Sequence, residues 1–283
     1  MKSKDLEFIT LFNKRLLPSS EWLVSQKVGL SLLSGQDDAH QIVANIGGQI
    51  PVSKGVFRKF TSGQALSHEC IDIYCKLFQL RDDRIAETHH DINNQRASYQ
   101  IFGRTIFLGN TFCANLTSTL VPEHIQLLLQ QYFPVNWKVE ETAFLVLIMN
   151  RCLTAEVTNP DSWSLIRINL HEHKIEYCDP RMERDVNLLS TFVTNSLHNI
   201  AANILIPVLR VVLPIYTGNW PITILDNQYF EHLQPTNQVD CGVYILACAY
   251  FLVQQVPIFF DQDCINRFRR HLAYWILCSS LPF

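Results

Sequence analysis

Apolar residues recur at intervals of three and four over the stretch 66–78, at positions 66, 70, 73, 74, 77 and 78. This is the spacing of one face of an amphipathic helix. Ser67 stands at the start of the stretch and belongs to the residue types that cap helix N-termini. The pattern therefore predicts a helix over residues 65–81, and the polar sequence after it predicts a loop over residues 82–100.

Strand patterns occupy the middle of the chain. Residues 144–149 are an uninterrupted apolar run of strand length, typical of a central strand that is covered on both faces. Residues 163–170 and 175–178 are two strand-like runs around the polar segment HEHK, and they predict an antiparallel hairpin. Strands with helices on both sides of them indicate the α+β class. The remaining patterns predict a strand within 101–110, helices within 111–120 and 121–131, a helix near 185–205, strands near 209–215 and 221–225, and helices over 242–253 and 264–277.

A shift in composition marks the candidate domain boundary. The stretch 47–55 contains three glycines and a proline, which favour a turn or a linker. Residues 1–45 predict two helical stretches, one of them over residues 22–33. We therefore expect an N-terminal helical extension over residues 1–50 and a folded domain over residues 51–283.

The composition predicts a folded chain without a strongly charged surface. Of its 283 residues, 48% are hydrophobic and 17% are charged, which excludes a disordered or low-complexity protein. The net charge is -3 and no basic cluster is present, so nucleic acid is not expected as a partner. The apolar stretches 203–216 and 241–260 are broken by proline and polar residues. A membrane span needs roughly 20 clean apolar residues, so no membrane association is expected.

The cysteines and the first residues indicate a compartment. Nine cysteines are an odd number and include no C-x-x-C pair, so neither a disulfide framework nor a zinc site is predicted. The N-terminal sequence carries acidic residues and only a short apolar run, unlike a secretory signal. We expect an intracellular protein of the nucleus or cytoplasm that uses no metal and no cofactor.

The strongest local signal for chemistry is Cys241. It is followed by Gly242 and a long apolar helical pattern, which places it at a helix N-terminus, where free N–H groups and the helix dipole favour a thiolate. Gln234, a few residues upstream, can donate its side-chain amide to an oxyanion together with a backbone N–H near the cysteine. The same pattern fits a buried cysteine with a packing role, so this motif alone leaves both interpretations open.

The predicted hairpin brings a second pair of polar residues together. If its strands pair about the HEHK turn, Ser162 lies opposite Asp179 at the open end of the hairpin. Directly opposed side chains on one face are within about 5.5 Å of each other. We therefore expect these two side chains to be neighbours, with one able to orient the other.

These segments together resemble the ubiquitin-like-protein protease family. WSLIRINLHEHKIEYCDP and QPTNQVDCGVY are similar to segments of the SUMO and sentrin-specific cysteine peptidases, whose wider clan includes the adenovirus protease. QALSHECIDIYCKLFQLRDDRI and NTFCANLTS are similar to two upstream segments of that family. The resemblance covers residues 55–281 and implies a papain-like or adenain-like fold, with a central mixed sheet flanked by helices and the nucleophile at a helix N-terminus.

The resemblance implies roles for individual residues. Cys241 matches the nucleophile, Asp179 the carboxylate that orients a histidine, and Gln234 the oxyanion donor. The position of the catalytic histidine, directly before Trp163, is occupied by Ser162. A serine neither pairs with a thiolate as an imidazolium does nor protonates a leaving amine. Any activity is therefore expected to be weak.

The resemblance also implies substrate-binding residues. Trp163 matches the aromatic residue that follows the catalytic histidine, and Asp240 belongs to an Asp-Cys-Gly motif that matches in full. Ala65 stands where the family has a tryptophan in the narrow channel for the substrate's C-terminal tail. A smaller side chain there widens the channel, so the grip on a substrate is expected to be weaker.

Other histidines are weaker candidates for the missing base. His171 and His173 lie in the predicted turn, roughly 20 to 30 Å along the hairpin from the missing histidine's position at about 3.3 Å per residue. His68, at the start of the first predicted helix, and His232, just before the oxyanion donor, are minor alternatives. The HEH triplet lacks a nearby cysteine or carboxylate partner, which favours an exposed turn over a metal site.

Functions of two classes remain open. An isopeptidase or endopeptidase would use Cys241 to cleave after the C-terminal Gly-Gly tail of SUMO, ubiquitin or a related ubiquitin-like protein, and one version treats Ser162 as an introduced substitution. A pseudoprotease would keep the fold and bind a ubiquitin-like protein or another partner without turnover, as the missing histidine and tryptophan suggest. Acyl transfer in the same clan needs the same histidine and is weakened equally.

Overall fold

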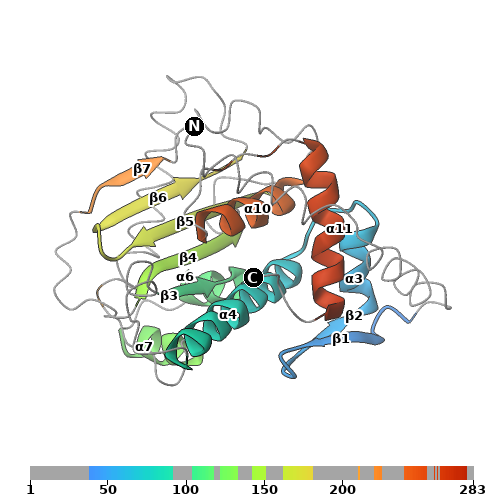
Figure 1. Ribbon diagram of the computed structural model, residues 1–283, viewed down its shortest axis with the longest axis horizontal. Coiled ribbons are helices and arrows are strands. Elements are labelled where there is room, and N and C mark those ends of the chain that lie inside the picture. The colour runs from blue at the N-terminus through green and yellow to red at the C-terminus, as the bar shows by residue number, and fades with distance from the viewer. Residues whose placement is uncertain are drawn as a thin grey trace. The chain divides into compact units, whose positions relative to one another are not determined.

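The structure is a computed structural model (Figure 1). The chain divides into two compact units. Unit 1 consists of Met1–Arg81 and Asp226–Phe283, and unit 2 consists of Asp82–Leu225. The structure describes residues 38–91, 104–117, 122–132, 142–150, 162–180, 210, 220–224, 239–253, 258, 260 and 262–278.

Within the described residues, unit 2 is built on a mixed five-stranded sheet. The inner pairs are antiparallel, whereas the two outer pairs are parallel (Figure 1). The strands predicted within 101–110 and over 144–149, 163–170, 175–178 and 221–225 are confirmed. In chain order, which is also their order across the sheet, the strands are β3 (Arg104–Leu108), β4 (Thr142–Asn150), β5 (Trp163–Asn169), β6 (Lys174–Cys178) and β7 (Ile222–Ile224).

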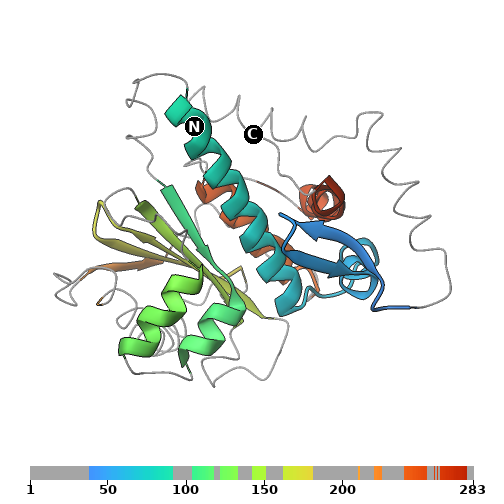
Figure 2. The same ribbon diagram turned by 90° about the horizontal axis from the view of Figure 1, so that it is seen from below.

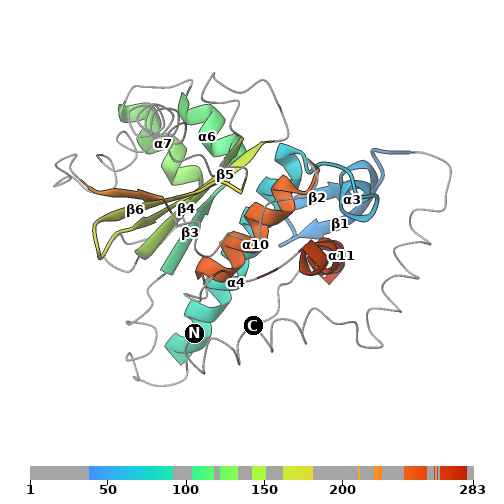
Figure 3. The same cartoon turned by 90° about the horizontal axis from the view of Figure 1, so that it is seen from above.

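Strand β4 is the buried centre of this sheet. All its residues but the last are buried, as expected for an apolar run covered on both faces. Helix α6 (Asn110–Thr117) packs against β4, and α7 (Pro122–Tyr132) packs against α6. Both helices lie on one face of the sheet (Figure 2, Figure 3). The side-chain oxygen of Asn110 accepts a hydrogen bond from the backbone N of Asn150 at 2.8 Å, which ties the start of α6 to the end of β4.

The hairpin of β5 and β6 is confirmed, but the predicted pairing of Ser162 with Asp179 is wrong. Leu165 pairs with Cys178, and continuing this register by one pair places Ser164 opposite Asp179. Ser162 lies two positions away from Ser164. Because side chains alternate along a strand, Ser162 stays on the same face as Asp179 when the register is continued, two residues further out.

The turn of this hairpin explains the shift. Asn169 pairs with Lys174, so that four residues lie between the paired ends. The side-chain oxygen of Asn169 accepts hydrogen bonds from the backbone N of His171 at 3.1 Å and of Glu172 at 2.9 Å, an Asx-type turn. His173 has a φ of 53°, in the left-handed region that closes such turns. Capture of the backbone by Asn169 thus ends β5 one residue before the apolar run ends.

In unit 1, the described chain begins with a hairpin where a helical extension was predicted. β1 (Ile42–Ile46) pairs antiparallel with β2 (Ile50–Ser53). Gly47 and Gly48, in its turn, have φ values of 58° and 71°, which residues with a side chain rarely adopt. The first glycines of the stretch 47–55 therefore form a turn between two paired strands, and the rest of the stretch is β2 and the start of α3. The domain boundary at residue 50 stays a prediction.

Helices make up the rest of the described part of unit 1, and α4 continues into unit 2. Ser67 directly precedes α4, as predicted, and its carbonyl accepts a hydrogen bond from the backbone N of Ile71 at 3.2 Å. α4 continues over residues 82–91, where a loop was predicted. The helices are α3 (Lys54–Thr61), α4 (His68–Asp91), α10 (Cys241–Val253) and α11 (Gln262–Cys278).

Where α4 continues past the predicted end, the first two residues of this continuation are paired with β3. A carboxylate oxygen of Asp82 accepts a hydrogen bond from the backbone N of Thr105 at 3.3 Å. Arg104 forms ion pairs with Asp82, at 3.7 Å, and with Asp83. This polar part of the helix is thus bonded to β3, which its polarity alone did not indicate.

Helix α10 is buried on all sides. Every residue of Cys241–Leu252 is buried, as expected for a helix that is apolar all round. The ring of Tyr250 lies 6.4 Å from Phe78 on α4, and 6.3 Å and 5.9 Å from Phe268 and Trp275 on α11, measured between ring centroids. These contacts hold α10 between two helices and so fix where its first residue lies.

Some predictions concern residues outside the described ranges. Arg210 is described and is helical, within the stretch for which a strand near 209–215 was predicted. Among the described helices, none is long and apolar enough to span a membrane. The helix over 22–33, the helix near 185–205, His232 and Gln234 lie outside the described residues.

Candidate functional site

Cys241 is the first residue of α10, as the sequence predicted. The backbone N of Tyr244 donates a hydrogen bond to the carbonyl of Asp240 at 2.9 Å, which closes the first turn of the helix. The cysteine is 0% exposed. It therefore lies at the positive end of a helix dipole, which favours an anionic sulfur, and inside the protein, where burial opposes one.

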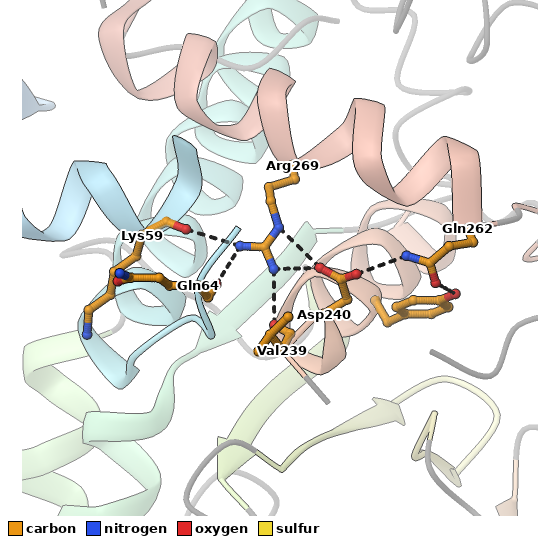
Figure 4. Close-up of polar contacts among 7 residues, drawn as sticks. Lys59, Gln64, Val239, Asp240, Gln262 and Arg269 are labelled. Carbon is orange, nitrogen blue, oxygen red and sulfur yellow. Dashed lines mark hydrogen bonds and ion pairs between the residues drawn. The ribbon is translucent and has the colours of Figure 1, made fainter. Parts of the chain in front are cut away.

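The carboxylate of Asp240, next to this cysteine, is bonded by α11. One carboxylate oxygen accepts hydrogen bonds from Arg269, at 3.2 Å from Nε and 2.6 Å from Nη2. The other accepts a hydrogen bond from the side-chain amide of Gln262 at 2.9 Å, and Gln262 in turn accepts one from the hydroxyl of Tyr244 at 2.8 Å (Figure 4). The turn before Cys241 is thus fixed through a side chain as well as through its backbone.

Arg269 also bonds three backbone carbonyls. Its Nη1 donates to the carbonyls of Lys59 at 3.1 Å and Gln64 at 2.6 Å. Its Nη2 donates to the carbonyl of Val239 at 3.0 Å (Figure 4). Arg269 and Asp240 are 6% and 3% exposed, so the ion pair between them is shielded from water. One buried side chain therefore joins the turn before α10 to the end of α3 and to the connection that follows it.

The connection between α3 and α4 carries the candidate channel residue. Ala65 is half-buried there, between the exposed Gln64 and the buried Leu66.

At the start of α4, the hydroxyl of Ser67 lies 3.4 Å from the sulfur of Cys70. Burial raises the pKa of Cys70 more than this contact lowers it, so Cys70 stays a neutral thiol at neutral pH.

In unit 2, the candidate residues gather at one end of the β5–β6 hairpin. Ser162 directly precedes β5 and is 1% exposed, and Trp163 opens the strand and is buried. Asp179 follows β6, is half-buried, and accepts a hydrogen bond from the hydroxyl of Tyr177 at 3.2 Å. The hydroxyl of Ser164 is buried and forms no hydrogen bond with the residues that the structure describes.

An ion-pair network stabilises this hairpin. Glu176 pairs with Arg167 directly across from it and with Lys174 at 2.9 Å on its own strand. Burial alone would raise the pKa of Glu176, but hydrogen bonds from the two cations outweigh burial and hold the pKa below its ordinary value. The guanidinium of Arg167 also lies 5.1 Å from the ring centroid of Phe144. This network supports the register that positions Asp179.

The alternative histidines lie elsewhere. His171 and His173 are exposed in the hairpin turn, at the end of β5 away from Ser162, and the ring of His173 stacks on Trp220 at 4.8 Å. His68 is exposed at the first residue of α4. Within the described ranges, no group of three or more histidine, cysteine or acidic residues is arranged to hold a metal ion.

The structure thus gathers the predicted residues in two groups. Unit 2 brings Ser162, Trp163 and Asp179 together, and unit 1 brings the turn of Asp240 and Cys241 together with the segment before Ala65. Gln234 lies outside the described residues.

Sequence reasoning missed Arg269 and Gln262. The signal for Arg269 was its place in the last helix, four residues after Ile265 and three before Leu272, on a buried face. An arginine on the apolar face of a helix needs buried partners. No comparable periodicity signal marks Gln262, which is the first residue of that helix.

No family model and no curated protein matches this sequence. The chain is similar in structure to the C-terminal protease domain of Ulp1 in complex with Smt3, the yeast ortholog of SUMO, with a TM-score of 0.64 and 16% identity over 93% of this chain and 96% of that chain. It is also similar to the catalytic domain of the Ulp1-like SUMO protease of Chaetomium thermophilum, with a TM-score of 0.61 and 15% identity over 94% of this chain and 92% of that chain. At these identities the likeness shows the fold, and the predicted α+β protease fold with its mixed sheet is confirmed.

Proposed function

We propose that this chain is a cysteine peptidase that removes or processes a ubiquitin-like protein, with weak activity because Ser162 replaces the family's histidine. The observation that carries the proposal is Cys241 at the first residue of a buried helix, in a fold similar to that of SUMO proteases. SUMO is the first modifier to test, because the similar Ulp1 domain is bound to the yeast ortholog of SUMO.

The reaction begins with attack of the Cys241 thiolate on the carbonyl carbon at the end of the modifier's tail. The side-chain amide of Gln234 and a backbone N–H at the start of α10 stabilise the negative oxygen of the tetrahedral intermediate. Collapse of this intermediate breaks the C–N bond, the amine takes up a proton from water and leaves, and a thioester remains. Water then hydrolyses the thioester to a carboxylate and the free thiol.

Proton transfer is the slow part of this reaction. The hydroxyl of Ser162 is neither a base for the thiol nor an acid for the departing amine. Asp179, whose family role is to orient an imidazole, bonds the hydroxyl of Tyr177 instead. General acid–base catalysis contributes roughly 10²–10⁴ to a rate, so turnover is slower by about that factor than it would be with the histidine.

A pseudoprotease that binds a ubiquitin-like protein without turnover is the second candidate. Ser162 is the observation that favours it, because one replaced residue removes the acid and base while leaving the fold intact. Ala65, in place of a channel tryptophan, weakens the grip on a tail in either case.

Probes carrying a C-terminal propargylamide on SUMO, ubiquitin and related modifiers separate the two candidates. The expected result is slow formation of a covalent adduct, read by intact mass. The adduct is absent in Cys241→Ala and retained in Cys278→Ala, which removes an exposed cysteine of α11.

Capture of a modifier without an adduct would support the pseudoprotease instead. If no modifier forms an adduct or is captured, both candidates are wrong.

A further inference from the structure

Arg269 uses every hydrogen-bond donor that it has. A guanidinium carries five N–H groups, and the structure gives this one five bonds. Two of them go to Asp240, and the others go to the carbonyls of Val239, Lys59 and Gln64. Because these carbonyls belong to the backbone, the bonds fix the course of the chain whatever side chains those positions carry.

The bonded groups belong to two segments that are far apart in sequence. Val239 and Asp240 form the turn directly before Cys241, whereas Lys59 and Gln64 are 210 and 205 positions from Arg269. The second segment leads directly into Ala65, the position where the resemblance implies a wall of the tail channel. Arg269 therefore spans the short distance between the nucleophile's turn and the candidate channel segment.

We propose that Arg269 is a positioning residue, which holds the turn carrying Cys241 against the backbone segment 59–64 so that a bound tail and the thiol meet in a fixed geometry. This inference rests on the proposed function for its meaning, but the geometry it describes lies wholly within unit 1. It also gives Asp240 a role other than substrate contact. Its carboxylate accepts the hydrogen bonds through which α11 holds the turn before Cys241.

Lysine cannot replace this arginine. An ammonium places its three donors on one nitrogen, whereas the planar guanidinium presents five donors in two directions. A lysine at this position has three donors for these five bonds, so at least two of the bonds to Asp240 and to the backbone carbonyls are lost. Arg270, the next residue of α11, is exposed and provides a matched control for the same substitution.

Two rates measured at Cys241 test the proposal. The first is alkylation by iodoacetamide, read by peptide mass spectrometry and normalised to Cys278, which is exposed on the same helix. The second is adduct formation with a saturating propargylamide probe, in this sequence or in Ser162→His, whichever reacts. Both are measured at a temperature where circular dichroism shows each variant folded.

In Arg269→Lys, alkylation of Cys241 should rise about tenfold relative to Cys278, because a loosened turn opens a buried thiol. Adduct formation at saturating probe should fall by about 10²-fold, the effect of misplacing a reacting group by about 1 Å. Arg270→Lys should change neither rate. Gln262→Ala, which removes the bond to the other oxygen of Asp240 and leaves the ion pair, should shift both rates in the same directions by less.

A purely structural role predicts a different result, and that result would overturn the proposal: Arg269→Lys melts earlier but leaves both rates of the folded protein unchanged. If Arg269→Lys does not fold, Gln262→Ala decides, and unchanged rates in that variant count against the proposal. If no probe reacts with any variant, the proposed function fails, whereas the alkylation ratio still decides whether Arg269 positions Cys241.

Discussion

The ion pair of Arg269 and Asp240 is almost completely removed from water. Removing one partner of such a pair leaves an uncompensated buried charge, which costs about 3–5 kcal/mol. We therefore expect Arg269→Met to lower the free energy of unfolding by about that amount in urea titrations, although methionine fills much of the same volume. Arg270→Met, at an exposed position, should stay within about 0.5 kcal/mol of the parent. Equal effects of the two substitutions would show that the buried pair contributes no more than a surface arginine.

Glu176 gives stability a dependence on pH. Its pKa in the folded protein lies below the ordinary value of 4.5, because hydrogen bonds from Arg167 and Lys174 outweigh the effect of burial. A lowered folded pKa means that the contribution is complete above the unfolded pKa and is lost as the pH falls through the folded pKa. Glu176→Gln should thus lower the free energy of unfolding by about 1–2 kcal/mol at pH 7.

This difference should shrink as the pH is lowered below about 4.5. Glu172→Gln, in the exposed turn of the same hairpin, is the matched control and should stay within about 0.5 kcal/mol of the parent at pH 7. A constant difference between Glu176→Gln and the parent from pH 7 to pH 3 would mean that the ionised carboxylate is not the stabilising form.

At the scale of elements, the β1–β2 turn contains a natural matched pair of glycines. Gly47 and Gly48 both have positive φ, so alanine at either position is strained by about 1 kcal/mol. A Cβ on Gly48 meets nothing within 4 Å, whereas a Cβ on Gly47 lies 2.9 Å from the end of the Leu80 side chain.

We expect Gly48→Ala to lower the free energy of unfolding by the strain alone. Gly47→Ala should lower it further, by up to about 1 kcal/mol, because the Leu80 side chain must change its rotamer. Chemical denaturation of the two variants measures the difference directly. A larger loss in Gly48→Ala than in Gly47→Ala would contradict the packing of this hairpin against α4.

For the whole molecule, the hydrophobic pattern was sufficient to predict an element wherever burial alone determines its structure. The apolar runs at β4 and α10 predicted their elements because both are covered on all sides. The pattern did not predict the extent or the register of an element where a specific polar contact determines it. The first residues of α4 beyond the predicted end are bonded to β3 through Asp82, and the register of β5 with β6 depends on the side chain of Asn169. Neither contact produces a periodic pattern of residues in the sequence.

The candidate site divides in the same way. Cys241 was predicted as the start of a helix because the apolar run that begins after it is a local signal. The network around it was not predicted, because Arg269 bonds groups 29, 205 and 210 positions away. Such partners are brought together only by folding. The family roles of Asp179 and Gln234 came from the resemblance alone, since neither residue has a local pattern that marks it.

The proposed reaction draws on both units of the chain, because Ser162 belongs to unit 2 and Cys241 to unit 1. Ser162→His should raise the rate of probe addition to Cys241 by about 10²–10⁴-fold, the usual effect of an acid–base group. Ser162 is 1% exposed, so the larger imidazole side chain costs about 1–3 kcal/mol of stability. The two rates must therefore be compared below the lower of the two melting temperatures.

Two variants show whether position or mere presence of an imidazole matters. Ser162→Ala should react as slowly as the parent, since the hydroxyl of Ser162 transfers no proton in the proposed reaction. Ser164→His places the ring within β5, directly opposite Asp179 when the register is continued. It should give no gain, because the ring stands two residues away from the position of the family's histidine. An equal gain in Ser164→His would contradict the assignment of position 162, and a loss of labelling in Ser162→Ala would make the serine itself a participant.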